Sequence, residues 1–466
     1  MKLSSLEIAQ AVQAISHSVR NQIVPSGYSI DSRTLRPGEC FIAIRGKNFD
    51  GHQFIPEALG KGASLVIAQS DVLGEVNAAW PVIVVEDTLS ALQRLAGHVR
   101  RKWGRKVVGI TGSTGKTTTK EITSSFLAAR FRVFKSLGNF NNDYGLPLSI
   151  LKLQEEEEVA VLELGMSAAG EISRLSKIAQ PDIGVVTNVN PVHLEFFQSI
   201  HRIAQAKREL VENLPSNGVA VLNNDDPHVR RFGHFFPGQV LTYGVRTAAG
   251  YRVSEIRFHG LNGSEFRLDH KGSGYLFSLP LIGLHNVYNC LPAIVVAHCL
   301  GLGFEVVDQR IKQLEPSPGR GEILHFAGGF TIVNDSYNSN PAALETMIQF
   351  LKRVPGYKRK ILVGGEMLEL GARSPEFHRS CGDLAAKAKL DFILGVSGQA
   401  CHLVEAARAR GYDADHALFF ENAMGAGVWL SPKVRAGDLI LIKGSRGVKT
   451  EFVIEALKQD HPLMEN

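Results

Sequence analysis

One short stretch, 109-GITGSTGKTTTK-120, limits most strongly what this chain can fold into. A nearly continuous apolar run, 106-KVVGIT-111, leads into it, and the helix-forming residues 118-TTKEITSSFLAAR-130 follow. Strand, glycine turn, Lys-Thr and helix, in that order, is the arrangement of a phosphate-binding loop. Its glycines let backbone N–H groups turn toward phosphate oxygens, and the helix N-terminus adds positive potential. The stretch therefore predicts a nucleotide site in an α/β domain.

The residue types in the loop predict how it would hold ATP and Mg²⁺. Lys116 would reach the terminal phosphates, and Thr117 would supply a hydroxyl ligand to Mg²⁺. The common form of the motif, G-x-x-x-x-G-K-[ST], has a glycine where Ile110 stands, so this loop is a variant. The alternative is a simple glycine turn before a helix. The residues predicted to contact ATP are Gly112, Ser113, Thr114, Gly115, Lys116, Thr117 and Thr118.

The pattern of apolar runs divides the chain into three predicted domains, because 466 residues are too many for one core. Residues 1–85 contain short strand-like runs with turn residues between them. In residues 86–315, buried-type strands such as 159-VAVLELG-165 and 182-DIGVVTNV-189 alternate with helices around the phosphate loop. Glycine-rich alternation over 242–284 predicts hairpins within that domain. Residues 316–466 repeat the strand–helix alternation, which favours a second, doubly wound and Rossmann-like α/β domain.

Composition narrows the class of protein. The net charge is only +5 and no basic block with interleaved aromatic residues appears, which argues against a nucleic-acid partner. The five cysteines are scattered without a C-x-x-C pair, so we expect reduced thiols in a cytoplasmic protein. Residues 1–19 read as an amphipathic helix, not as a signal peptide. No apolar run approaches the roughly 20 residues that span a bilayer, so we expect no membrane insertion. We also expect a monomer.

Further motifs follow the loop in a fixed order, and together they indicate a family. The loop form T-G-S-T-G-K-T resembles that of the Mur ligases and of their folylpolyglutamate synthetase relatives. The later segments that resemble family elements are 138-GNFNNDYGLP-147, 187-TNVNPVHLEFFQSIHRIAQAKREL-210, 283-GLHNVYNCLPA-293 and 318-PGRGE-322. Tyr144 departs from the aliphatic residue expected at its position. On these motifs the chain is identified as a member of the Mur ligase family, with a resemblance from about residue 31 to 455.

The resemblance implies a set of catalytic and metal-binding residues in the central domain. Glu163 ends a predicted parallel strand, where a carboxylate opens onto the ligand crevice; in the family the matching glutamate binds Mg²⁺ shared with ATP. His193 and Lys207 match a histidine and a lysine at a second Mg²⁺. The lysine is carbamylated in several members, and a carbamate offers oxygen ligands where an ammonium would repel the metal. The alternatives are a solvated helix lysine and a histidine bonded to a backbone carbonyl.

The family also places residues around the nucleotide from more distant parts of the chain. Asn289 would contact the adenine, Arg320 would reach the nucleotide from across the cleft, and Asp335 matches an aspartate near the ribose or phosphates. Each of these could instead finish a strand or cap a helix. The ordered occurrence of all of them is what favours the functional interpretation.

The last domain indicates which amino acid is added. No D-N-P-R box is present, and 335-DSYNSNPAAL-344, 364-GGEMLELG-371, 378-HRSCG-382 and 443-KGSRGVKTE-451 resemble the member that adds D-alanyl-D-alanine to UDP-N-acetylmuramoyl-tripeptide. Glu366 stands where that member usually has aspartate. Residues that would hold the dipeptide are Tyr337, Asn338, Asn340, Lys443, Ser445 and Arg446. Arg446 would pair with the dipeptide carboxylate, although helix capping at 444–447 is an equally simple interpretation.

The first domain resembles the UDP-binding domain of the same enzymes over 31-DSRTLRPGECFIAIRGKNFDGHQFIPEALGKGA-63. The residues implied on the side of the sugar nucleotide are Ser32, Arg33, Gly46, Asn48, His52, Asn141, Asn142 and Ser167. The alternatives are a pair between Arg33 and a surface carboxylate, and a plain turn into a strand at 36-RPGECF-41.

The implied reaction is an ATP-dependent ligation. The tripeptide carboxylate attacks the γ-phosphorus of ATP to give an acyl phosphate and ADP, and the amine of D-alanyl-D-alanine then displaces phosphate. Rival hypotheses are a Mur-type ligase that adds a different amino acid, a P-loop ATPase acting as a switch, and a catalytically silent nucleotide-binding module.

Overall fold

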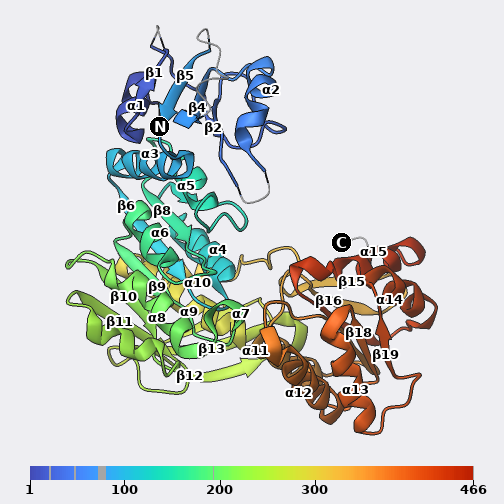
Figure 1. Cartoon of the computed structure of the whole chain (residues 1–466). Helices are drawn as coiled ribbons and strands as arrows, with labels where there is room; N and C mark the ends of the chain where they lie inside the picture. Colours follow the sequence, from blue (N-terminus) through green and yellow to red (C-terminus); the bar gives the residue numbers. More distant parts are fainter. Residues whose placement is uncertain (20–21, 47–48, 72–79, 193, 465–466) are drawn as a thin grey trace.

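The computed structural model describes residues 1–19, 22–46, 49–71, 80–192 and 194–464, so Asn48 and His193 lie outside the described residues. Three β-sheets follow one another along the chain, and Figure 1 shows them as blue, green and orange-to-red bodies. This confirms the predicted α/β fold with three domains. The limits at residues 85 and 315 stay predictions. In the described part of the chain, no helix is both long and apolar enough to cross a membrane.

The first sheet has five strands in the order β1-β5-β4-β3-β2, all parallel except β1. Its strands are β1 (Ser16–His17), β2 (Tyr28–Ser29), β3 (Cys40–Ile42), β4 (Leu65–Gln69) and β5 (Val82–Val85), with helices α1 (Ser5–Val12) and α2 (Ile55–Gly60). The helix expected over 1–19 is shorter because Gln13 adopts a left-handed conformation and the chain turns into β1.

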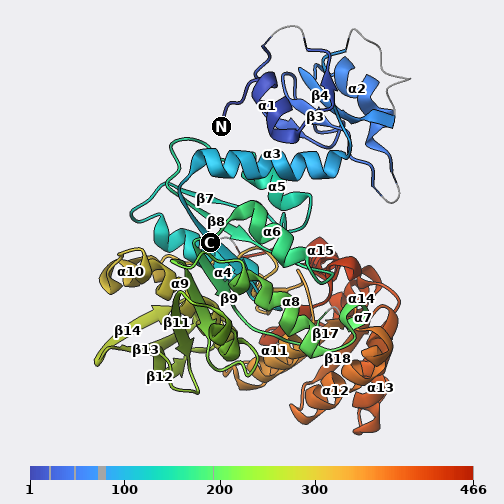
Figure 2. The same cartoon turned by 60° about the vertical axis from the view of Figure 1, so that its left-hand side comes forward.

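Helix α3 (Thr88–Trp103) joins the first sheet to the central domain. Figure 2 shows it lying lengthwise between the two. Apolar side chains along α3, such as Leu92 and Leu95, belong to one buried cluster that extends from Ile67 of the first sheet to Leu162 of the central sheet. The first domain therefore shares its apolar core with the central domain.

The central sheet has nine strands in the order β14-β13-β12-β11-β10-β9-β6-β8-β7. They are β6 (Lys106–Thr111), β7 (Val133–Lys135), β8 (Val159–Glu163), β9 (Ile183–Val186), β10 (Val219–Asn223), β11 (Gln239–Gly244), β12 (Tyr251–Phe258), β13 (Ser264–His270) and β14 (Ser273–Leu279). Strands β7 to β11 pair in parallel with their neighbours, and β12 to β14 form antiparallel hairpins. The hairpins predicted over 242–284 are thus confirmed, and they extend one edge of this sheet.

Helices cover both faces of the central sheet, and two separate apolar clusters lie against it. The helices are α4 (Lys116–Leu127), α5 (Gly145–Ile150), α6 (Glu171–Ala179), α7 (Leu194–Phe197), α8 (Ile200–Glu212), α9 (Leu284–Cys299) and α10 (Phe304–Ile311). Strand β6 lies between β8 and β9, so the phosphate loop that follows β6 opens at a switch point of the sheet, where ligands of parallel α/β folds bind.

The third sheet has six strands in the order β15-β16-β20-β17-β18-β19, all parallel except β15. Its elements are β15 (Glu322–His325), β16 (Thr331–Asp335), α11 (Pro341–Arg353), β17 (Arg359–Gly365), α12 (Ser374–Lys387), β18 (Phe392–Val396), α13 (Cys401–Ala409), β19 (Ala417–Phe420), α14 (Ala423–Leu430), β20 (Asp438–Lys443) and α15 (Glu451–Asp460). A separate apolar cluster lies on each face. The predicted doubly wound domain is therefore confirmed, with an antiparallel edge strand that the sequence pattern did not indicate.

Candidate nucleotide and substrate cleft

A cavity of about 510 Å³ lies where the central and C-terminal domains meet. The carboxyl ends of β6, β8, β16 and β20 all open onto it. The predicted site residues that line it are Ser113, Thr114, Gly115, Lys116, Thr117, Thr118, Asn141, Glu163, Asn289, Arg320, Asp335, Tyr337, Asn338, Asn340, Lys443, Ser445 and Arg446. Residues that lie up to about 330 positions apart in the sequence are thus brought to one cleft.

The phosphate loop ends at Gly115, and α4 begins at Lys116. Gly115 has a φ of +79°, and a Cβ there would lie 2.1 Å from Oδ1 of Asn289. A side chain is therefore excluded both by the backbone conformation and by the neighbouring helix α9. Nζ of Lys116 donates to the carbonyl oxygen of Gly112 at 3.0 Å, and burial lowers the pKa of Lys116 below its ordinary value.

The segment 187-TNVN-190, after β9, supports the phosphate loop from the side. Oδ1 of Asn188 accepts the backbone N–H of Thr114 at 3.0 Å, and Oγ1 of Thr187 donates to the carbonyl of Thr114 at 2.7 Å. The hydroxyl of Ser113 accepts the N–H of Asn190 at 2.8 Å. Thr187, Asn188 and Asn190 were not among the predicted site residues. The sequence feature that could have indicated them is the polar pair Thr187-Asn188 directly after β9, the strand that pairs with β6.

Thr117, Glu163 and Asn141 form a chain of hydrogen bonds at the floor of the cleft. Oγ1 of Thr117 donates to Oε2 of Glu163 at 2.8 Å, and Nδ2 of Asn141 donates to Oε1 of Glu163 at 2.8 Å. Glu163 is 2% exposed, so its carboxylate faces the cleft and not bulk solvent. A carboxylate beside a hydroxyl is a donor set of hard oxygens, which fits Mg²⁺.

Arg320, from the segment that enters the C-terminal domain, reaches across the cleft to the phosphate loop. Its Nη2 donates to Oγ1 of Thr117 at 3.1 Å, and its guanidinium lies 4.0 Å from the centre of the Tyr337 ring. Another bridge joins the domains nearby, where the N–H of Glu195 in α7 donates to the carbonyl of Glu369 at 3.4 Å. Two contacts between the central and C-terminal domains therefore lie beside the cleft.

On the C-terminal side, Asp335 and Lys443 form a buried ion pair at the ends of the adjacent strands β16 and β20. Nζ of Lys443 lies 2.6 Å from Oδ2 of Asp335 and donates to the carbonyl of Asn338 at 2.9 Å. His285, at the start of α9, lies near this pair. Its Nδ1 is buried without a hydrogen-bond partner among the described residues, and burial lowers the pKa of its imidazole.

Other predicted dipeptide contacts are partly engaged within the C-terminal domain. Oδ1 of Asn340 caps α11 by accepting the N–H of Ala343 at 3.0 Å. Oγ of Ser445 accepts the N–H of Leu368 at 3.0 Å, and Arg446 pairs with Glu451 at 2.8 Å. All three predicted residues still line the cavity. These residues therefore combine bonds within the C-terminal domain with positions on the cavity wall.

Glu366, the departure from aspartate, does not line the cavity. Its Oε1 accepts the N–H of Gln399 at 3.0 Å, before α13. Gly398 makes room for it, since a Cβ at that position would lie 2.2 Å from Oε2 of Glu366. The longer acidic side chain therefore fits within the C-terminal domain away from the cleft.

Lys207 lies on α8 with only 2% exposure. Among the residues that the structure describes, none forms a hydrogen bond or an ion pair with its amine. Burial, and secondarily the like charge of Lys116, lower the pKa of Lys207 well below its ordinary value. This burial excludes the interpretation of Lys207 as a solvated helix lysine. His193, its predicted companion, lies outside the described residues.

The remaining predicted residues do not line this cavity. Oδ1 of Asn142 accepts the N–H of Gly145 at 2.8 Å at the start of α5, and the N–H of Ser167 donates to Glu171 at 2.6 Å. Gly112 precedes the lined part of the phosphate loop. Asn142, Ser167 and Gly112 therefore do not lie on the wall of the cavity between the central and C-terminal domains.

In the first domain, the predicted uridine contacts make mostly internal bonds. The hydroxyl of Ser32 donates to Glu57 at 3.2 Å, and exposed Arg33 pairs with Asp31 at 2.7 Å. Nε2 of His52 accepts the N–H of Gln69 at 3.0 Å, so its Nδ1 carries the proton and donates to Asp50 at 2.5 Å. The N–H of Gly46 donates to the carbonyl of Phe49 at 2.8 Å. Their roles toward UDP stay predictions.

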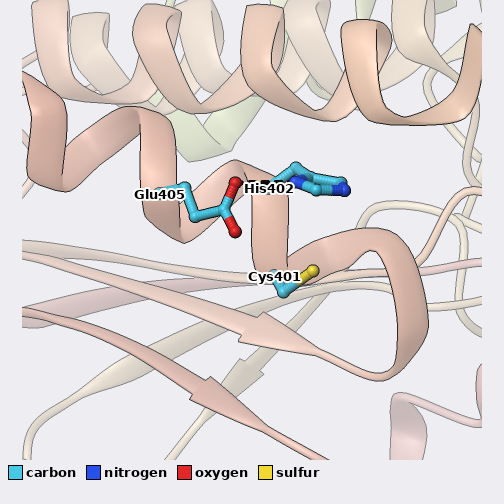
Figure 3. A group of neighbouring side chains, drawn as sticks. All are labelled: Cys401, His402 and Glu405. Carbon is cyan, nitrogen blue, oxygen red and sulfur yellow. Dashed lines mark hydrogen bonds and ion pairs between the residues drawn. The ribbon is translucent and has the colours of Figure 1, made fainter.

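A group of potential metal ligands also lies away from the cleft, on α13. Figure 3 shows Cys401, His402 and Glu405, whose candidate ligand atoms lie within 4.8 Å of one another. Nη2 of Arg379 lies 3.1 Å from Nδ1 of His402 and 3.6 Å from Oε2 of Glu405. A positive charge therefore already stands beside both groups, and the arrangement is a partly exposed ion-pair network.

Fold and cleft together define a P-loop nucleotide-binding protein of three α/β domains, in which the C-terminal domain completes the site. Residues 25–100 match the Mur ligase family catalytic domain, residues 110–297 the Mur ligase middle domain, and residues 319–446 the Mur ligase glutamate ligase domain. The chain is 35% identical over 458 residues to the UDP-N-acetylmuramoyl-tripeptide–D-alanyl-D-alanine ligase of Bacillus subtilis (strain 168), with 98% of each chain covered. It belongs to the Mur ligase family.

Solved structures agree in fold over nearly the whole chain. Crystal structure I of MurF from Acinetobacter baumannii has a TM-score of 0.89 at 28% identity and covers 98% of this chain and 99% of that one. The MurF ligase from Thermotoga maritima in complex with ADP has a TM-score of 0.83 at 33% identity, with 93% and 97% covered. The resemblance stated from the sequence motifs is therefore confirmed.

Proposed function

We propose that this protein is an ATP-dependent ligase that joins D-alanyl-D-alanine to the terminal carboxylate of UDP-N-acetylmuramoyl-tripeptide. The observation that carries the proposal is one cavity in which Lys116, Thr117 and Glu163 of the phosphate-loop half face the Asp335–Lys443 pair of the C-terminal half. The full-length similarity to D-alanyl-D-alanine-adding enzymes supports this choice of substrates over another amino acid.

The reaction needs activation because a carboxylate is a poor electrophile, whose leaving group would be oxide. The tripeptide carboxylate attacks the γ-phosphorus of ATP and gives an acyl phosphate and ADP. The amine of D-alanyl-D-alanine then attacks the acyl carbon, and inorganic phosphate leaves. Closure of the cleft around the substrates would shield the acyl phosphate from water. The contacts of Arg320 and Glu195 across the two domains are suited to support such closure.

Both reactants are anionic, so the cleft must neutralise charge. The backbone N–H groups of the phosphate loop and the ammonium of Lys116 would meet the ATP phosphates. Arg320 adds a cation from across the cleft, next to Thr117. Asn289 beside Gly115 would contact the adenine, and Asp335 the ribose or phosphates.

Mg²⁺ fits the oxygen donors of Thr117 and Glu163, with a second site at His193 and Lys207. When bound, Mg²⁺ would supply charge neutralisation of the phosphates and the acyl phosphate. Asn141 orients the Glu163 carboxylate from its other oxygen. The lowered pKa of Lys207 favours its neutral amine, which is the form that reacts with carbon dioxide to give a carbamate. Carbamylation of Lys207 is therefore part of the proposal.

The domains divide the substrates between them in this proposal. Residues 1–85 would hold the UDP moiety through Ser32, Arg33, Gly46, Asn48 and His52. Residues 86–315 would bind ATP and, through Asn141, Asn142 and Ser167, the sugar-peptide side. Residues 316–466 would hold the dipeptide, with Lys443, Ser445, Arg446, Tyr337, Asn338 and Asn340 as its candidate contacts. We further propose that the protein works as a monomer in the cytoplasm.

The test is phosphate release from ATP by the purified protein, with UDP-N-acetylmuramoyl-tripeptide and D-alanyl-D-alanine supplied singly and together. We expect release that needs both, with an amide-linked pentapeptide product by mass spectrometry. A parallel preparation of Lys116→Ala should release at least about 100-fold less phosphate, because it lacks the phosphate-loop cation, and it controls for contaminating ATPase.

The other outcomes identify the rivals. Phosphate release that ignores both substrates would identify an ATPase switch. Release that requires the nucleotide substrate together with a different amino acid would keep the reaction type but overturn the dipeptide assignment. Bound nucleotide without any release would indicate a silent module.

A further inference from the structure

Lys120 is a completely buried lysine that the proposed reaction does not use. It lies on α4, one turn after Lys116, and its side chain has 0% exposure. Its Nζ donates to the carbonyl of Ser136 at 2.6 Å and to that of Gly138 at 3.2 Å, and lies 3.2 Å from Oε1 of Glu121. All three donors of the ammonium thus have partners, which is the condition for burying a charge.

The two carbonyl groups belong to the loop of residues 136–142, which follows β7. Oγ of Ser136 accepts the backbone N–H of Glu163 at 3.2 Å, and the carbonyl of Asn141 accepts the N–H of Gly165 at 2.7 Å. Asn139 and Asn141 of this loop line the cleft, and Asn141 donates to the Glu163 carboxylate at 2.8 Å. The loop is therefore fastened to β8 on one side and to α4 on the other.

The side of the loop that faces α4 depends on Lys120. Ser136 is buried, so an apolar residue at position 120 would leave its carbonyl without a donor, which is costly. The carbonyl of Gly138, an exposed residue, would lose the same donor and turn to water. Elsewhere the loop packs weakly, with Leu137 53% and Phe140 40% exposed. Loss of the ammonium would thus release the loop locally, while the segment 187–190 and α9 still contact the phosphate loop on its other sides.

We propose that Lys120 is a positioning residue that couples the phosphate-loop helix to the loop of residues 136–142, and so sets Asn139 and Asn141 for the sugar-peptide substrate. The assignment of that substrate rests on the proposed function. The coupling itself rests on the hydrogen bonds of Lys120 alone. A purely structural lysine would stabilise the whole domain, whereas a positioning lysine affects one loop and one substrate.

The test compares Lys120→Met with a matched exposed lysine of the same domain, Lys312→Met, whose side chain is 57% exposed. In Lys120→Met we expect KM for UDP-N-acetylmuramoyl-tripeptide to rise about tenfold or more, with KM for D-alanyl-D-alanine within about twofold of the wild type. Kd for ADP is measured without Mg²⁺, because Asn141 also orients Glu163, and should likewise stay within about twofold. Hydrogen exchange should become faster in peptides covering 136–145 and stay unchanged in α8 and α9. Lys312→Met should match the wild type in every measurement.

Two results would overturn the proposal: wild-type KM values with unchanged exchange in 136–145, or a uniform change of all constants with faster exchange throughout the central domain. If Lys120→Met does not fold, Lys120→Gln replaces it, because its amide can still donate to one carbonyl and should give a smaller shift in the same direction. The exchange measurement needs no substrate. A wild-type protein without ligase activity would therefore refute the proposed function and still leave the coupling testable.

Discussion

Asp335 and Lys443 occupy paired positions at the carboxyl ends of β16 and β20, and their side chains meet 2.6 Å apart in the wall of the cleft. Only 4% of the Lys443 side chain and 16% of the Asp335 side chain is exposed. The register of two parallel strands thus places a cation and an anion where both reactants of the proposed ligation would meet.

Because this ion pair is buried, we expect Lys443→Met to lower the free energy of unfolding of the C-terminal domain strongly. Removal of the lysine leaves a mostly buried carboxylate without its partner, so the C-terminal domain should lose about 3 kcal/mol of unfolding free energy. Urea titration followed by hydrogen exchange in β16 and β20 measures it. The control is Lys458→Met, whose partner Glu455 is 54% exposed and whose loss should cost less than about 1 kcal/mol. Equal effects of the two variants would contradict this account.

Gly115→Ala should remove nucleotide binding without unfolding the protein. The new Cβ would lie 2.1 Å from Oδ1 of Asn289 at a φ of +79°, so we expect Kd for ADP to rise at least about 10-fold. Gly272 is the matched control, because it has a φ of +80° with nothing within 4 Å of its Cβ. Gly272→Ala should cost only about 1–2 kcal/mol of stability and leave ADP binding unchanged. Calorimetric titration with ADP separates the two.

Lys207→Ala should lose at least about 100-fold in phosphate release, because the proposed carbamate would be absent. A short carboxylic acid such as formate should restore part of the activity by supplying carboxylate oxygens in the space that the side chain vacates. Lys116→Ala, which lacks a cation and not an anion, should not respond to the acid. Normal activity of Lys207→Ala without any acid would refute a metal-binding role.

Because His378 is buried, we expect the free energy of unfolding to decrease at acidic pH. It is fully buried, its Nε2 accepts the N–H of Met367 at 3.0 Å, and its Nδ1 donates to the carbonyl of Ser374 at 2.8 Å. Burial lowers the pKa of His378, although the bond to Ser374 opposes the shift. As the pH falls through about 6.5, the unfolded chain takes up a proton that the native protein refuses, so the unfolding free energy decreases.

Replacement of this histidine by His378→Leu should therefore flatten the pH dependence. Below about pH 6.5, the slope of unfolding free energy against pH should fall by up to about 1.4 kcal/mol per pH unit, the value for one proton. Denaturant titrations between pH 7 and pH 5 measure it. An unchanged slope would show that His378 titrates alike in both states.

The sequence could predict those parts of the site that depend on local order along the chain. The run from β6 through Gly115 to α4 and the place of Glu163 at the end of β8 follow from strand ends and turn residues, and both lie in the cleft as expected. The support by Asn188 could not be predicted in the same way, because it depends on which strand pairs with β6. Sheet order is a tertiary property that a single sequence does not display.

The hydrogen-bond partners of individual side chains could not be predicted from the sequence either. Nothing local shows that His52 uses both ring nitrogens within its own domain, or that Asn340 caps α11. The burial of Lys120 was also invisible, because a lysine that follows a phosphate loop on an amphipathic helix has the pattern of a solvated face. The helix expected over 1–19 ended early at Gln13 because a left-handed residue there redirected the chain into β1.

The two apolar clusters on either side of the third sheet have a consequence for how such enzymes diversify. The wall that carries Asp335 and Lys443 is built on clusters that belong almost wholly to the C-terminal domain, with Ile282 as a contribution from the central domain. The first domain, in contrast, shares one large cluster with the central domain. We therefore expect that exchange of the C-terminal domain can change amino-acid preference, provided that the graft keeps Arg320 and Asp335, which reach the nucleotide side of the cleft. In engineering terms the C-terminal domain is a separable unit. A graft would be joined at the segment around Arg320, so that the contact between Arg320 and Thr117 is kept.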